Sequence, residues 1–158
     1  MGDVIEVATT VAAPAQDVYA ALSDITRMGE WSPECSGGQW LAGATEAKPG
    51  ARFRGSNKNG VWRWSTRCII EKAEPGTELA WAVTFLGRPV ARWGYRFEPD
   101  GHGGTVVTES WEDRRGMLFK AGGPVASGVG DRTAHNKKSM EVTLERVKRA
   151  VENARSAS

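Results

Sequence analysis

The chain of 158 residues has few of the side chains that build disulfide frameworks or metal sites, with two cysteines and two histidines. Cys35 and Cys68 cannot form a framework, which favours a reduced, cytoplasmic protein and leaves a single bridge between them open. Two histidines, with cysteines far apart in the sequence, also argue against a zinc site. We therefore expect no metal.

Charge of one sign, long apolar runs and nucleotide-binding motifs are missing as well. The formal net charge is +2, so we expect no dominant attraction to nucleic acid or anionic lipid. No apolar run approaches the roughly 18 residues of a transmembrane helix, and the N-terminus lacks the basic leader of a secretory signal. Without a P-loop, a G-x-G-x-x-G turn or a G-x-S-x-G elbow, the sequence predicts no cofactor. We expect a single domain over residues 1–158 that binds no nucleic acid.

The end of the chain predicts one long amphipathic helix, from Asp131 to about Ala154. Its apolar residues recur at spacings of four, three, four and three, which forms a single stripe along one helix face; they are Met140, Leu144, Val147, Val151 and Ala154. Asp131 is suited to capping the first turn. A helix of this length needs a large apolar surface to pack against, because most helical stability comes from packing.

The preceding residues predict a first strand, two short helices and then a series of strands. The β-branched residues at 4–11 favour a strand, and Pro14 suits the first turn of a helix that continues to about Asp24, where a second short helix begins. Turn signals then separate expected strands at 38–41, 51–56, 61–72, 78–85, 90–98 and 105–113. Asn57–Gly60, which contains an Asn-Gly pair, marks one hairpin. The pattern predicts an antiparallel meander.

The expected strands alternate between an apolar and a polar face. From Trp62 to Ile70 the even positions are Trp, Trp, Thr, Cys and Ile, whereas residues 63, 65 and 67 are Arg, Ser and Arg. One apolar and one polar face indicate a half-buried antiparallel sheet, which the C-terminal helix can cover. The basic residues between Arg52 and Arg67 are then interpreted as a solvated outer face rather than a nucleic-acid surface.

Seven tryptophans are the unusual feature of the composition. Because a buried tryptophan needs a partner for its N–H group, tryptophans on the inner face could line a cavity for an apolar or aromatic ligand. A solid aromatic core is the alternative, and the residues leave both open. The candidate ligand-binding residues are Trp31, Trp40, Phe53, Trp62, Trp64, Trp81, Phe85, Trp93, Tyr95, Trp111, His135, Met140 and Leu144.

Glu109 is the candidate catalytic residue. The more apolar phase of the strand at 105–113 contains Val107 and Trp111, so it is expected to face inward and to carry Glu109 with it. Desolvation would raise the pKa of this carboxyl group, which could then donate a hydrogen bond or act as a general acid. The alternative is a structural glutamate that pairs with an arginine or with His135.

The stretch Gly116–Gly130 lies between the last strand and the final helix and holds five glycines and a proline. It is interpreted either as a plain connection or as a mobile flap over the space between sheet and helix.

The order of elements resembles the helix-grip fold of the START/Bet v1-like (SRPBCC) superfamily. The segments DITRMGEWSPEC at 24–35, ARFRGSNKNG at 51–60, TVVTESWEDRR at 105–115 and AHN at 134–136 are similar to its polyketide cyclase/dehydratase-like branch. The resemblance implies an α+β fold in which a curved antiparallel sheet of about six to seven strands wraps round a long C-terminal helix. It also implies a hydrophobic cavity between them, but no particular reaction.

Three functions are weighed for this chain. The leading hypothesis is binding or transport of a small hydrophobic molecule, aromatic or polyketide- or lipid-like, in the internal cavity. The rival is a cyclase/aromatase or dehydratase that uses a cavity acid–base residue and no metal or nucleotide. The third is a protein-interaction module similar to quinone-binding or toxin-like relatives, acting through its surface.

Overall fold

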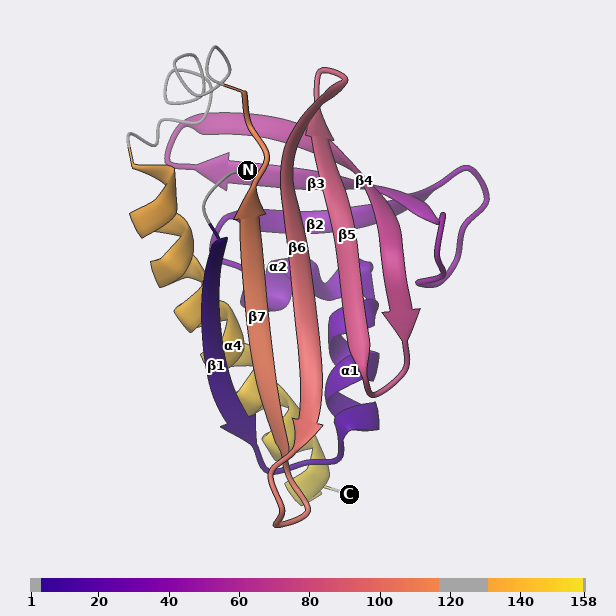
Figure 1. The fold of residues 1–158 in the computed structure, drawn as a ribbon, viewed down its shortest axis with the longest axis vertical. Helices are drawn as coiled ribbons and strands as arrows, with labels where there is room; N and C mark the ends of the chain where they lie inside the picture. Colours follow the sequence, from indigo (N-terminus) through magenta and orange to yellow (C-terminus); the bar gives the residue numbers. More distant parts are fainter. Residues whose placement is uncertain (1–3, 117–130, 158) are drawn as a thin grey trace.

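A computed structural model describes residues 4–116 and 131–157 of the chain. In this part, seven strands form one curved antiparallel sheet with helices on its inner side (Figure 1). The strands are β1 (Val4–Val11), β2 (Cys35–Leu41), β3 (Arg52–Asn59), β4 (Trp62–Glu74), β5 (Glu78–Phe85), β6 (Arg88–Pro99) and β7 (Thr105–Asp113). The helical elements are α1 (Ala15–Ser23), the 3-10 turn η1 (Ile25–Arg27), α2 (Met28–Trp31) and α4 (Arg132–Ala157). The predicted α+β helix-grip fold is confirmed.

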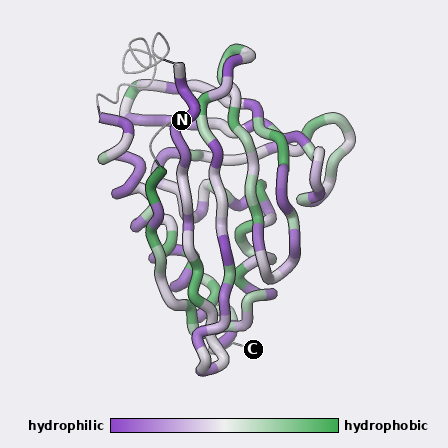
Figure 2. Tube along the Cα trace, viewed as in Figure 1, coloured by the Kyte–Doolittle hydropathy of each residue, from purple (hydrophilic) through white to green (hydrophobic). Residues whose placement is uncertain are grey.

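The sheet order is β1-β7-β6-β5-β4-β3-β2, so the first strand joins the last one. In the β1–β7 register, Val4 lies opposite Glu112 and Val11 opposite Thr105. Hydrophilic and hydrophobic positions alternate along the strands (Figure 2), as expected for a sheet with one buried face.

The β3–β4 hairpin corrects one predicted boundary. Residues 57–59 were expected in the turn but lie in β3, with Asn59 opposite Trp62, and Val61 was expected to begin the next strand, so the loop consists of Gly60 and Val61. Gly60 has a φ of +60°, which glycine adopts without strain and which a type II′ turn requires at its first loop position. The other early boundary, at β2, lies at Cys35 rather than at residue 38.

Helix α4 packs its predicted apolar stripe into the fold. The Asp131 carboxylate accepts the backbone N–H of Ala134 at 3.1 Å, which caps the helix. Buried side chains on α4 are Asn136, Met140, Thr143, Leu144, Val147 and Val151. Ala154 was expected in this stripe but is exposed, because the buried face ends at Val151 and the following turn lies at the surface near α1, where Arg155 pairs with Asp17 at 3.6 Å.

The helix is also tied to the end of β1. Lys148 Nζ donates to the Thr10 carbonyl oxygen at 2.7 Å, and Glu152 Oε2 accepts the N–H of Ala12 at 2.8 Å. These contacts place α4 along the β1 side of the sheet rather than across its middle (Figure 1). The space inside β3 to β6 is therefore bordered by side chains from the sheet, from α2 and from the first half of α4.

Two further expectations concern the stretch Gly116–Gly130 and membrane-spanning helices. The choice between a flap and a plain connection for Gly116–Gly130 concerns residues 117–130, which lie outside the described residues. Within the ranges 4–116 and 131–157, no helix combines the length and the apolar character needed to cross a membrane.

Candidate functional site

A cavity of about 170 Å³ lies between the sheet, α2 and the first half of α4. The predicted site residues that line it are Trp31, Phe53, Trp64, Trp81, Phe85, Trp93, Tyr95, Glu109, Trp111 and Met140. Phe53 and Trp81 are buried at its inner end, whereas Trp64, Phe85 and Val90 are half-buried and mark where it approaches the surface. The sheet face that sequence alternation selected is therefore the face that lines the cavity.

Other predicted residues lie outside the lining formed by the described chain. Trp40 lies opposite Phe53 in the β2–β3 register and packs beside it, with its ring 5.8 Å from that of Phe53 in an edge-to-face arrangement. Trp62 is 41% exposed at the end of the β3–β4 hairpin, and Leu144 is buried in the core beyond the cavity. His135 contacts a lining residue, Glu34, rather than the cavity itself. These placements are corrections: alternation reports the face of a strand, but not how far along the strand the cavity extends.

Several polar lining residues were missed by the sequence reasoning. They are Glu34, Asn57, Thr66, Arg115, Arg132 and Asn136, together with the two cysteines. A signal existed for four of them: Thr66 and Cys68 share the predicted apolar face of their strand, and Arg132 and Asn136 precede Met140 by eight and four residues and so continue its stripe toward the helix start. Glu34 offered no such signal, since it lies in the turn before β2.

Aromatic rings form a continuous row across the inner face of the sheet. The ring of Phe53 lies 5.8 Å from that of Trp81, and the ring of Trp81 lies 5.9 Å from that of Tyr95. Trp93 and Trp111, which are opposite each other on β6 and β7, have ring centroids 6.5 Å apart. Such contacts hold the walls in fixed orientations and leave apolar ring faces for a ligand.

Glu109 and Tyr95 form the polar centre of this aromatic wall. They are directly opposite in the β6–β7 register, and the Tyr95 hydroxyl donates to Glu109 Oε1 at 2.8 Å. Glu109 is 2% exposed and Tyr95 5% exposed. The second carboxyl oxygen of Glu109, Oε2, is buried and has no partner in the described structure. The alternative that Glu109 pairs with an arginine or with His135 is therefore wrong.

Burial sets the protonation of this pair. It raises the pKa of Glu109 to about 8, while the hydrogen bond from Tyr95 acts in the opposite direction. Burial, and next the charge on Glu109, raise the pKa of Tyr95 well above its usual value. At neutral pH the Glu109 carboxyl is therefore mostly protonated, and a protonated carboxyl can donate a hydrogen bond as well as accept one.

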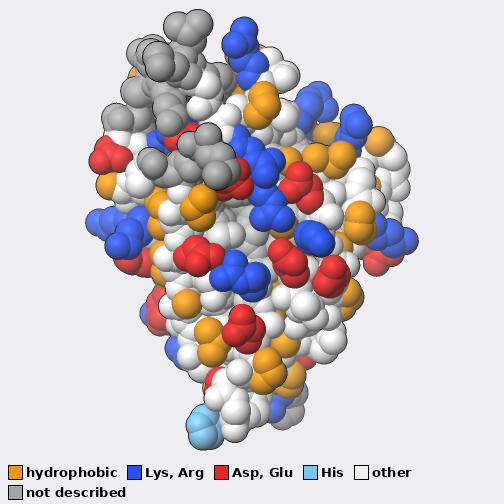
Figure 3. Space-filling model, in the orientation of Figure 1, with side chains coloured by type: hydrophobic (Ala, Val, Ile, Leu, Met, Phe, Trp, Pro, Cys, Tyr) orange, Lys and Arg blue, Asp and Glu red, His pale blue; other side chains and the backbone are white. Residues whose placement is uncertain are grey.

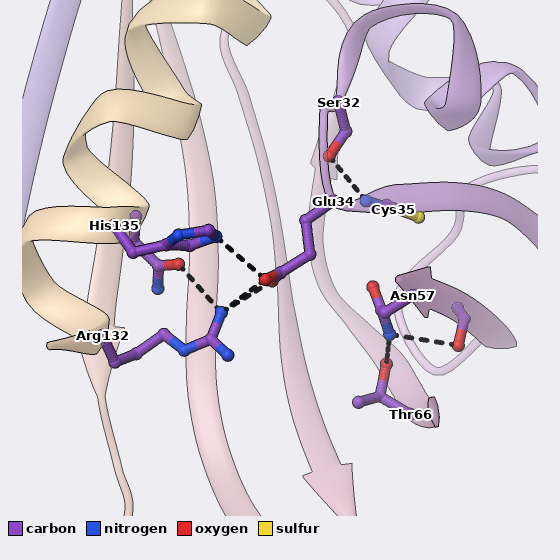
Figure 4. A network of polar contacts seen from close by, with 9 residues as sticks. Ser32, Glu34, Cys35, Asn57, Thr66, Arg132 and His135 are labelled. Carbon is purple, nitrogen blue, oxygen red and sulfur yellow. Dashed lines mark hydrogen bonds and ion pairs between the residues drawn. The ribbon is translucent and has the colours of Figure 1, made fainter. Parts of the chain in front are cut away.

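A second polar cluster connects α4 to the turn before β2 (Figure 4). Arg132 Nη1 lies 2.7 Å and 2.8 Å from the two carboxylate oxygens of Glu34, and His135 Nε2 lies 3.0 Å from Glu34 Oε2. The guanidinium group of Arg132 also sits 5.8 Å from the ring centroid of Trp64. This cluster holds the start of the helix against β4 and closes one side of the cavity with charged groups.

Both cysteines face the cavity as free thiols. Burial raises the pKa of Cys35 and raises that of Cys68 to about 12, so neither thiol is activated as a nucleophile. Among the described residues, no group of three or more histidine, cysteine or carboxylate side chains is arranged to hold a metal ion.

A family model described as "Polyketide cyclase / dehydrase and lipid transport" matches residues 3–152. The chain is also similar to the solved polyketide_cyc-like protein Cgl2372 from Corynebacterium glutamicum, with 32% identity, a TM-score of 0.56 and coverage of 97% of this chain and 91% of that one. No curated protein sequence matches the chain.

Two more distant structures share the fold alone. DynU16, from the dynemicin biosynthetic locus, has 20% identity and a TM-score of 0.66 over 98% of this chain. The di-domain ARO/CYC protein StfQ from the steffimycin biosynthetic pathway has 12% identity and a TM-score of 0.69 over 96% of this chain. The chain spans about half the length of each, 49% of DynU16 and 46% of StfQ.

Proposed function

The chain belongs to the polyketide cyclase / dehydrase and lipid transport family, and from that premise we propose that it binds a small aromatic molecule in the cavity between sheet and helix. The aromatic walls support this proposal, because ligand pockets are mainly apolar with a few placed polar groups. The cavity volume of about 170 Å³ is similar to the ~150 Å³ of an apolar cavity that accepts benzene. A compact ligand of one or two rings fits such a space.

The observation that carries the proposal is the unpartnered Oε2 atom of Glu109. A buried polar atom without a partner costs free energy, and the cost is relieved when a ligand supplies that partner. In its protonated form Glu109 would donate to a ligand carbonyl or phenol oxygen while Tyr95 fixes the orientation of the carboxyl. We therefore expect the ligand to carry an oxygen acceptor next to an aromatic ring.

A matched pair of probes tests this expectation. 1,4-Naphthoquinone and naphthalene have similar ring systems, but the quinone alone offers carbonyl acceptors. Titrations followed by tryptophan fluorescence should give saturable quenching, with tighter binding of the quinone to the natural protein. Glu109→Leu should remove that preference, whereas Glu109→Gln, which retains a donor, should keep it. Absence of saturable quenching by either probe would overturn the proposal.

Catalysis of a cyclase or dehydratase type is the second candidate, and the pKa of Glu109 is what favours it. A carboxyl group that titrates at about 8 can transfer a proton near neutral pH. In a dehydration, Glu109 would protonate the departing hydroxyl group as its C–O bond breaks, and the resulting carboxylate would take the α-proton as the C=C bond forms, so that one water leaves and Glu109 is protonated again. Turnover of a β-hydroxy ketone that stops in Glu109→Gln while binding persists would establish this activity. Binding without turnover in the natural protein would leave the carrier function alone.

A further inference from the structure

The outer face of the β3–β4 hairpin carries basic residues placed directly opposite one another. Arg54 lies opposite Arg67 and Lys58 opposite Arg63, and all four side chains are exposed. Like charges in directly opposite positions destabilise an antiparallel pair. We call these four residues the basic ladder. This repulsion lowers the stability of the sheet, and a negatively charged partner bound to these residues would remove it.

The basic ladder differs from the rest of the outer face in its partners. On β6, Arg92 pairs with Glu71 and Arg96 pairs with Glu6, both at 2.8 Å. Within the ladder, Arg54 donates to the Gln39 side-chain oxygen and Arg63 to the Gly60 carbonyl oxygen, neither of which carries a charge. Figure 3 shows acidic and basic side chains close together over the middle of this face, and basic side chains alone toward its upper right border.

Exposed apolar side chains lie at the tips of the two hairpins next to the basic ladder. Val61, in the β3–β4 loop, is 91% exposed, and Trp62 next to it is 41% exposed. Leu86, at the tip of the neighbouring β5–β6 hairpin, is 85% exposed and has a φ of +52°, a conformation that favours glycine or asparagine. A large apolar residue at an exposed and strained position gains nothing from the folded chain itself.

We propose that this end of the sheet docks on an anionic lipid bilayer. The basic ladder contacts the headgroups, while Val61, Trp62 and Leu86 enter the interfacial region. Basic residues are attracted to anionic lipid, and tryptophan prefers the membrane–water interface, where its ring is buried and its N–H group remains hydrated. The formal net charge of +2 does not reveal this basic surface, because acidic residues elsewhere in the chain balance its positive charge.

Nucleic acid is the competing partner for a basic hairpin, and the geometry disfavours it. Single-stranded nucleic acid needs aromatic rings on the basic face for its bases to stack on. The pair between the two basic rungs is Ser56 opposite Ser65, and Trp64 lies on the other face of the strand, against the cavity. The exposed Val61 and Leu86 would also have no role against a phosphate backbone.

Docking in this orientation brings the cavity toward the bilayer. Phe85 precedes Leu86 in the chain, and Trp64 follows Val61 of the hairpin loop by three residues; both line the half-buried end of the cavity. A hydrophobic ligand could then pass between the bilayer and the cavity without crossing water. This last step rests on the proposed function, whereas the docking itself does not.

Vesicle sedimentation with the full chain tests the docking directly. Vesicles of phosphatidylcholine mixed with phosphatidylglycerol should bind the protein, and vesicles of phosphatidylcholine alone should not. The double variant Arg54→Gln/Arg67→Gln should weaken binding by roughly tenfold or more, the loss expected for two basic residues near an anionic surface. Arg146→Gln/Arg149→Gln on α4 removes the same charge from an exposed helix surface and should bind nearly as well as the natural protein.

The apolar tips are tested by Val61→Ser/Leu86→Asn, which retains every charge and suits the local φ at residue 86. This variant should also bind the mixed vesicles more weakly. Equal losses in the ladder variant and in its α4 control would mean a nonspecific charge effect and overturn the proposal. Binding of an oligonucleotide that the ladder variant loses and the tip variant keeps would identify a nucleic-acid surface instead. Failure of the natural protein to bind the mixed vesicles would also refute docking.

Discussion

Glu109 should make the stability of this protein depend on pH in an unusual direction. Burial raises the pKa of its carboxyl from 4.5 to about 8. In the unfolded chain the group loses its proton near 4.5, whereas in the folded protein it keeps the proton up to about 8. Between these values the folded state holds one more proton, so the free energy of unfolding decreases as pH rises. The contribution is complete below the lower value and is lost once pH passes the upper one.

The size of the effect follows from the same two values. One proton changes the free energy of unfolding by about 1.4 kcal/mol per pH unit, so the interval from 4.5 to about 8 corresponds to at most roughly 5 kcal/mol. Domains of this kind have a total stability of about 5–15 kcal/mol, so the loss would be readily measurable. Glu109→Gln removes the titration while its amide oxygen can still accept the Tyr95 hydroxyl.

Denaturant unfolding of both proteins, from about pH 5 to about pH 9, measures this effect. The natural protein should match the Gln variant at the acidic end and fall progressively below it toward pH 8. Glu112→Gln is the matched control, since Glu112 lies on the outer face of β7, is only half-buried and pairs with Arg114. If the difference between the natural protein and Glu109→Gln stays constant over this range, the carboxyl is not held protonated by burial.

Further substitutions test the packing and the site. Leu144→Ala should lower the free energy of unfolding by about 2–5 kcal/mol, because a fully buried leucine leaves a cavity; a loss below about 0.5 kcal/mol, as at surface sites, would mean that α4 is not packed there. Trp64→Ala and Trp93→Ala should each weaken naphthoquinone binding in the quenching titration, and unchanged affinity would remove the substituted wall from the site. Arg132→Ala should cost roughly 1.5–3 kcal/mol, because the largely buried Glu34 loses its charged donor; in a double-mutant cycle with Glu34→Ala, additive losses would show that the pair contributes nothing.

The position of Glu109 on the inner face could be predicted from the sequence, but its hydrogen-bond partner could not. Alternation placed it on the same face as Trp111, and an acid on an apolar strand face predicts desolvation. Its partner was beyond such reasoning, because Tyr95 is 14 residues away and meets Glu109 through the register of the β6–β7 hairpin. Whether its Oε2 atom finds a hydrogen-bond partner likewise depends on all the side chains that surround it in the fold.

The Glu34–Arg132 pair is a stronger example, since 98 residues separate its members. Glu34 belongs to a turn and has no periodicity that distinguishes it from a solvated charge. Arg132 continues the stripe of α4, but a stripe cannot identify the partner of a charged residue. Trp40 and Trp62 were expected to line the cavity, but the lining formed by the described chain does not include them. Trp40 packs on the inner face beside Phe53, outside the cavity lining of the described chain, and Trp62, which alternation placed on the inner face, reaches solvent at a hairpin end.

The sequence by itself determined the elements, the apolar face of each strand and the stripe of the final helix, because these depend on periods of two or about 3.6 residues along the chain. The tertiary structure decided which strand pairs with which, how far the cavity extends and which polar atoms in it find partners. Those properties arise from contacts between residues distant in the chain. The pairing of β1 with β7, the Tyr95–Glu109 hydrogen bond and the direct opposition of Arg54 to Arg67 and of Lys58 to Arg63 became visible only when strand register was known.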